Sequence, residues 1–182
     1  MRRGIIAASA AALVAAIWAG VPAVMAAVPG PAYLAVTSFS AVAQNAETAT
    51  LFVTTMGDIP RRADSFINAN PVVGLAWADL DNGKVFVAVI HPVLGRDSLQ
   101  NPDGWHVHTA TVTGGATAPH DFCVASIDST PTAGISIVGN TMQVNVRLSS
   151  LPVSPGAFNA AAGFTLQPDS ACASGLAVQL ST

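Results

Sequence analysis

From about residue 30 onward, the sequence is a succession of short runs of β-branched and aromatic residues, separated by Gly, Pro, Asn and Asp. No long segment shows the 3.6-residue period of an amphipathic helix. Glu and Lys, two residues that favour helices, occur only once each, as Glu47 and Lys84. Runs of this kind, each ended by turn-forming residues, are typical of β-strands joined by short loops.

The strand pattern predicts an all-β fold. The expected strands cover residues 33–42, 48–55, 72–80, 84–91, 104–113, 122–128, 134–138, 142–148, 161–166 and 176–180. Strands at this spacing indicate an antiparallel β-sandwich or a flattened Greek-key barrel of about 8–10 strands. The segment 84–90 is apolar at successive rather than alternate positions, so we expect it to lie centrally, with both of its faces covered. Asp81-Asn82-Gly83 before it is a hairpin signal.

The N-terminus resembles an export signal. Arg2 and Arg3 precede an apolar run over residues 4–20, and Val24-Met25-Ala26 offers a small-residue cleavage site. We expect residues 1–26 to be a cleaved signal peptide and residues 27–182 to form a single β-sandwich domain. The alternative is an uncleaved anchor, because the apolar run approaches the ~20 residues that span a bilayer. Cleavage predicts a secreted or periplasmic protein, not transmembrane, with envelope or extracellular proteins as possible partners.

The composition excludes two classes of protein. Hydrophobic residues make up 51% of the chain, which is too many for an intrinsically disordered protein. The chain has seven Lys and Arg against ten Asp and Glu, and the predicted signal holds two of the seven. The predicted mature part therefore carries a net charge of −5 with neutral histidines. Such a chain lacks the basic surface that a nucleic-acid-binding protein needs.

Cys123 and Cys172 are the only cysteines. An even count in an oxidising compartment predicts a structural disulfide between them. The alternative is that the two thiolates bind a metal ion.

All four histidines lie within 30 residues: His91, His106, His108 and His120. In a strand, residues i and i+2 point to the same side, so His106 and His108 can bind one ion from one sheet face. His91 ends the preceding predicted strand and His120 lies in the loop that follows, so either can reach the same site. Imidazole suits zinc or copper. The alternative is that the histidines only occupy a polar strand face, a strand end and a turn.

The segment Gly104-Trp105-His106-Val107-His108 resembles the metal-binding strand of copper/zinc superoxide dismutases, which reads Gly-Phe-His-Val-His. Ala118-Pro119-His120 is similar to the Gly-Pro-His of that family, whose histidine bridges the two metals. The family also joins a cysteine in this region to one near the C-terminus, as Cys123 and Cys172 would be joined here. CHRD-type secreted domains likewise carry a His-x-His strand on an all-β scaffold. The resemblance implies an all-β, secreted metal-binding domain.

A departure from the dismutase pattern limits what the resemblance implies about activity. The dismutase pattern needs further metal-binding histidines after the bridging one, and no histidine follows His120. Our first hypothesis is therefore an extracytoplasmic β-sandwich that binds one copper or zinc ion through His106, His108, His120 and His91. The second is a structural or adhesive envelope module with no metal and no catalysis. The sequence identifies no reaction, because the full dismutase ligand set is absent.

Overall fold

The computed structural model describes residues 30–62, 72–91, 104–118 and 120–181. Within them, every regular element except two short 3₁₀ turns is a β-strand. The strands are β1 (Val36–Ala43), β2 (Thr48–Thr55), β3 (Val73–Asp79), β4 (Lys84–Ile90), β5 (His106–Gly114), β6 (Phe122–Ser129), β7 (Ala133–Val138), β8 (Thr141–Arg147), β9 (Ala160–Pro168) and β10 (Leu176–Ser181). The 3₁₀ turns η3 (Leu148–Ser150) and η4 (Pro155–Ala157) lie between β8 and β9. The predicted all-β class is confirmed.

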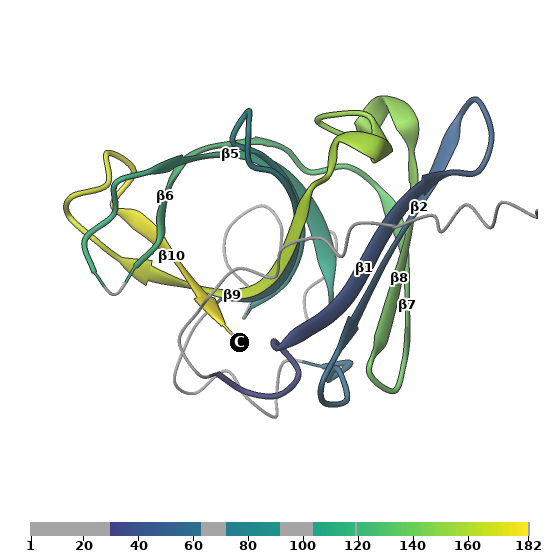
Figure 1. The fold of residues 1–182 in the computed structure, drawn as a ribbon, viewed down its shortest axis with the longest axis horizontal. Helices are drawn as coiled ribbons and strands as arrows, with labels where there is room; N and C mark the ends of the chain where they lie inside the picture. Colours follow the sequence, from purple (N-terminus) through teal and green to yellow (C-terminus); the bar gives the residue numbers. More distant parts are fainter. Residues whose placement is uncertain (1–29, 63–71, 92–103, 119, 182) are drawn as a thin grey trace, which may run out of the picture.

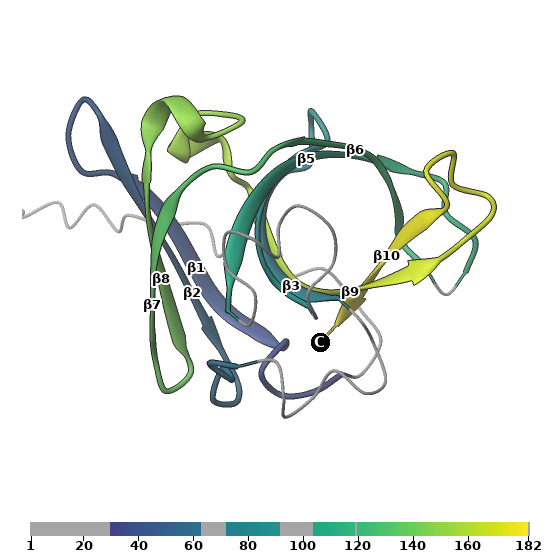
Figure 2. The same ribbon diagram turned by 180° about the vertical axis from the view of Figure 1, so that it is seen from behind.

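The strands form two antiparallel sheets. Six of them close into a barrel in the order β10-β6-β5-β4-β3-β9, and the other four form a sheet in the order β1-β2-β8-β7. Figure 1 looks along the barrel, so its strands form a ring with the four-stranded sheet at one side, and Figure 2 shows the same arrangement from behind. The fold thus combines the two predicted architectures, since a closed barrel packs against a separate sheet.

β4 is covered on both faces, as its apolar sequence predicts. Val85, Val87 and Val89 belong to the core inside the barrel. The alternate residues, from Phe86 to Ile90, belong to the core between the barrel and the sheet. Because successive side chains of a strand point to opposite faces, a strand between two cores must be apolar at every position.

Trp77 of β3 joins the barrel to the four-stranded sheet. Its side chain is fully buried, and its ring centroid lies 6.1 Å from that of Phe86. Its indole Nε1–H donates a hydrogen bond of 3.0 Å to the carbonyl oxygen of Phe52 in β2. A buried indole N–H needs such a partner, so this contact fixes the barrel against the sheet at one position.

The predicted hairpin between β3 and β4 is present. Gly83 has a φ of 62°, and a Cβ atom there would lie 2.4 Å from the carbonyl oxygen of Val112. The Gly83 carbonyl oxygen also accepts a hydrogen bond from the Val112 N–H at 2.8 Å. Glycine is therefore required at this position for two reasons, its backbone conformation and the close approach of β5.

The predicted disulfide is present between Cys123 and Cys172, whose Cα atoms are 5.2 Å apart. It lies at the shortest seam of the barrel, where β10 meets β6 through two residue pairs: Ala177 opposite Cys123, and Val178 opposite Phe122. The disulfide therefore helps to close the barrel between β6 and β10, where the strand pairing is shortest.

The predicted signal peptide, residues 1–26, lies outside the described residues, so its cleavage stays a prediction, as does the domain range 27–182. Within the part of the chain that the structure describes, no helix has the length and hydropathy needed to span a membrane.

Candidate metal centre

Three of the four histidines lie together at one end of β4 and β5. The two strands pair so that His106 is opposite Val89 and His108 is opposite Val87. His91 follows Val89 by two residues, and so continues the face on which Val87 and Val89 lie. Antiparallel pairing therefore brings His91 next to His106, although fourteen residues separate them in the sequence.

The ring nitrogens of these three residues converge. Each histidine offers one nitrogen, and the three atoms lie within 4.8 Å of one another. The Nε2 atoms of His91 and His106 are 3.0 Å apart and are joined by a hydrogen bond. Two nitrogens that each lie about 2.0–2.1 Å from a tetrahedral zinc ion are about 3.3 Å apart. The His91–His106 separation is therefore close to that of two ligands of one ion, and the His108 nitrogen lies within 4.8 Å of both.

Hydrogen bonds at the opposite ring nitrogens orient two of the rings. The His106 Nδ1–H donates to the Gly104 carbonyl oxygen at 3.2 Å, which leaves the Nε2 lone pair directed at His91. The Nδ1 of His108 lies 3.0 Å from the Thr130 hydroxyl oxygen. Metal-binding histidines commonly make such a contact through their second nitrogen, which fixes the tautomer and the ring orientation.

Two of the three histidines are largely shielded from water, and His106 is partly buried. The exposed fractions of His91 and His108 are 9% and 6%. The rings of His106 and His108 are 5.0 Å apart, and those of His91 and His106 are 4.7 Å apart, in both cases nearly perpendicular. The three rings are therefore packed against one another, and two of them have little contact with water.

The donor set decides which ions fit. Among the described residues, the cluster consists of three imidazoles, without a carboxylate or a thiolate. Neutral nitrogen donors suit zinc and copper(II), whereas calcium and magnesium require oxygen ligands. Three protein ligands on a four-coordinate ion leave one position for water or another small ligand.

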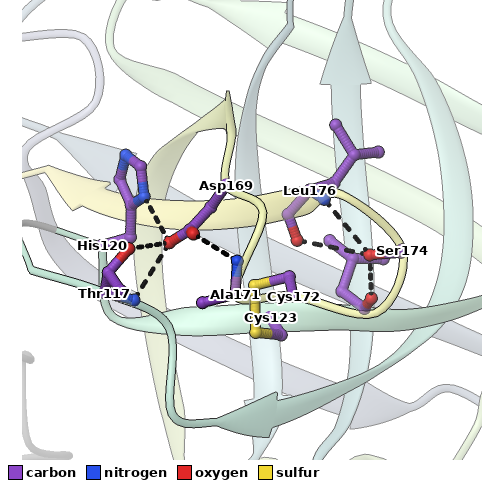
Figure 3. The surroundings of a disulfide bond; sticks show 9 residues. Thr117, His120, Cys123, Asp169, Ala171, Cys172, Ser174 and Leu176 are labelled. Carbon is purple, nitrogen blue, oxygen red and sulfur yellow. Dashed lines mark hydrogen bonds and ion pairs between the residues drawn. A yellow bond between two sulfur atoms is a disulfide. The ribbon is translucent and has the colours of Figure 1, made fainter.

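His120, the fourth predicted ligand, is not brought into this cluster. Its Nδ1–H donates to the Oδ2 atom of Asp169 at 3.1 Å. Figure 3 shows this pair beside the Cys123–Cys172 disulfide, with Thr117 and Ala171 also directed at the carboxylate. The structure thus places His91, His106 and His108 in one group and gives His120 a different partner.

Asp169 is the centre of a hydrogen-bonded corner. Its side chain is only 5% exposed. Its Oδ2 atom accepts from both the hydroxyl and the backbone N–H of Thr117, and its Oδ1 atom accepts from the N–H of Ala171 at 2.8 Å. These bonds hold the pKa of Asp169 well below its usual range. The hydrogen bond from the Thr117 hydroxyl has the largest effect, followed by those from the Ala171 N–H and from His120.

The sequence does not identify Thr130, Gly104 or Asp169 as partners of the histidines. Thr130 follows the last residue of β6, and its contact with His108 depends on the register in which β6 pairs with β5. That register includes two irregularities, which no local pattern predicts. Asp169 is 49 residues from His120, and no motif connects them.

Comparison with known proteins gives no relative: no protein-family model, no curated protein and no solved structure matches this chain.

Proposed function

We propose that this protein binds one zinc or copper(II) ion through His91, His106 and His108. The observation that carries the proposal is the convergence of three imidazole nitrogens within 4.8 Å, in a cluster that contains no other candidate ligand among the described residues. Two of the three rings are also held at their second nitrogen, by Gly104 and Thr130. Such support is characteristic of a site whose ligands are oriented before the ion arrives.

The proposed site is a site for a single ion. His106 and His108 match the His-Val-His strand of the dismutase-like resemblance, and His91 supplies the third ligand in place of His120. With His120 bonded to Asp169, we assign no bridging ligand and no second metal. The proposal therefore concerns metal binding, with one coordination position left for a small ligand, and includes no dismutase reaction.

The proposed location is outside the cytoplasm. The export-signal pattern over residues 1–26 supports it, and so does the disulfide, because such bonds persist in oxidising compartments.

The test is a metal titration of protein produced without a histidine tag, first stripped with a chelator. We expect one equivalent of zinc or copper to bind with a Kd below about 10 μM, which corresponds to about 7 kcal/mol. The variant His106→Ala/His108→Ala should lose this binding. His120→Ala is the matched control, because it removes the same type of side chain from outside the cluster.

Two results would contradict the proposal: no stoichiometric binding by the unaltered protein, or equal losses in the double variant and in His120→Ala. Circular dichroism of each variant shows whether it is folded, so a loss of binding can be distinguished from a loss of structure. Without metal binding, the alternative of a structural or adhesive envelope module would be preferred.

A further inference from the structure

The interior of the barrel contains an apolar cavity of about 230 Å³. All six barrel strands contribute to its wall. Representative lining residues, one from each strand, are Ala78 of β3, Val87 of β4, Ala110 of β5, Val124 of β6, Ala162 of β9 and Val178 of β10. Figure 1 shows the six strands that carry these lining residues, viewed along the barrel.

The cavity exists because many of the inward-facing side chains are Ala or Val, although Phe122 and Phe164 also line it. A barrel of eight strands is just wide enough for side chains to fill, so a barrel of six is easily filled by residues of ordinary size. Alanine at positions such as 78, 110 and 162 leaves the centre empty. The core on the other side of β4 instead contains large side chains, including Trp77 and Phe86. Empty space in a core is destabilising, because the lining atoms lose contacts there, and a ligand that fills it restores them.

The wall of the cavity is polar in one place. His91 and His108 are its polar lining residues, and every other residue of the lining is Ala, Val, Leu, Ile or Phe. A ligand inside therefore meets hydrocarbon on most of its surface and can satisfy one polar group, at the histidines. Leu80, Ile127 and Leu176 line the cavity and are also 38–56% exposed, so apolar side chains connect the cavity with the protein surface.

We infer that the barrel binds a small amphiphile, with its hydrocarbon part in the cavity and its single polar group at His91 and His108. The volume sets the size of the ligand. An apolar cavity of about 150 Å³ accommodates benzene, with six non-hydrogen atoms, so 230 Å³ accommodates about nine. A medium-chain alcohol of eight carbon atoms has this size. The inference rests on the cavity and its lining, and does not require a bound metal ion.

The test uses protein from the full chain, stripped of metal with a chelator, and n-octanol as the probe. We expect saturable binding, measured by nuclear magnetic resonance, with chemical-shift changes at barrel-lining residues. Nuclear Overhauser effects should connect the methyl end of octanol to lining valines and its hydroxyl-bearing end to the His108 ring. An octanediol with a hydroxyl at each end should bind at least about tenfold more weakly, because its second hydroxyl has no partner in the apolar part.

A cavity-filling variant checks the location. Ala162→Leu should weaken octanol binding by at least about tenfold, because the added carbon atoms occupy the space of the ligand. Ala43→Leu is the matched control, since it makes the same change at an exposed position of β1 and should leave binding within about twofold. Absence of octanol binding, equal affinity for the diol, or equal effects of the two variants would overturn the inference. Because metal is absent throughout, these outcomes are independent of the proposed metal site.

Discussion

The molecule contains two histidine environments that differ in the partner offered to the ring. At the end of β4 and β5, the ring nitrogens of His91 and His106 face each other at 3.0 Å, with His108 beside them. Near the disulfide, His120 faces the carboxylate of Asp169, which also accepts from Thr117 and Ala171. The first environment brings three imidazoles together, whereas the second places one imidazole against a carboxylate.

This difference shows that proximity in sequence does not make histidines equivalent. Imidazole nitrogens that converge in this way can bind one zinc or copper ion together. A histidine paired with a nearly buried carboxylate already has the interaction that it needs. We therefore propose metal binding for the first environment and structural support of the β6–β10 corner for the second. Each of the following predictions tests this division.

The largest expected effect is that of the disulfide, which belongs to the structural environment. Cys123→Ala/Cys172→Ala removes a link between residues 49 apart, and the chain-entropy relation gives a loss of about 4 kcal/mol in the free energy of unfolding. Denaturant unfolding of both proteins measures it. Metal affinity of the folded variant should be unchanged, and a parallel loss of metal binding would show that the two environments are coupled.

The second prediction compares one histidine from each environment. His91→Ala should weaken zinc or copper binding by at least about 100-fold, a change of about 2.8 kcal/mol, because it removes one of three ligands. His120→Ala should leave the affinity within about threefold, the change expected for a site without shared partners. Isothermal titration with both variants gives the two values. If the order of the effects were reversed, the division proposed above would be wrong.

A smaller effect on metal affinity is expected for Thr130, which contacts a histidine of the proposed metal site. Thr130→Val retains the shape of the side chain but removes the hydroxyl that contacts His108 Nδ1, and should weaken metal binding by about tenfold. Thr113→Val, on the same strand as His108 but at its exposed end, is a suitable control. Equal affinities of Thr130→Val and the unaltered protein would show that His108 is oriented by other contacts.

The smallest effect concerns pH, and belongs to the structural environment. The pKa of Asp169 is lower in the folded protein than in the unfolded chain, where a value of about 3.9 is usual. Its ionised form therefore stabilises the fold above that value, and this contribution is lost as the pH falls toward the folded-state pKa. Asp169→Asn should be less stable at neutral pH and should show a smaller decline in stability below about pH 4.

Unfolding at several pH values measures this difference. Asp128→Asn provides a comparison, because the pKa of Asp128 is also lowered, mainly by its hydrogen bond to Ser126, but its side chain is a third exposed. We expect a weaker pH effect at Asp128, since water screens exposed charges. An equal effect at both positions would show that the burial of Asp169 does not increase its contribution to the pH dependence of stability.

Much of the fold could be predicted from local pattern. The strand over residues 48–55 begins and ends as expected, and β4 has the two covered faces that its apolar run predicts. Gly83 lies in the expected turn, and the Cys123–Cys172 pair is bonded. These features depend on side-chain alternation, turn chemistry and a cysteine count of two, each of which is visible in a short segment or in the composition.

The strands, the disulfide and the face shared by His106 and His108 could be predicted before folding was considered, because all three follow from local geometry or from the count of a residue type. The position of His91 beside this pair and the contact of His120 with Asp169 become visible only in the folded chain. The same is true of the closure of six strands into a barrel and of the apolar cavity beside the cluster. Strand register and barrel closure depend on contacts between distant segments, and no local pattern records them.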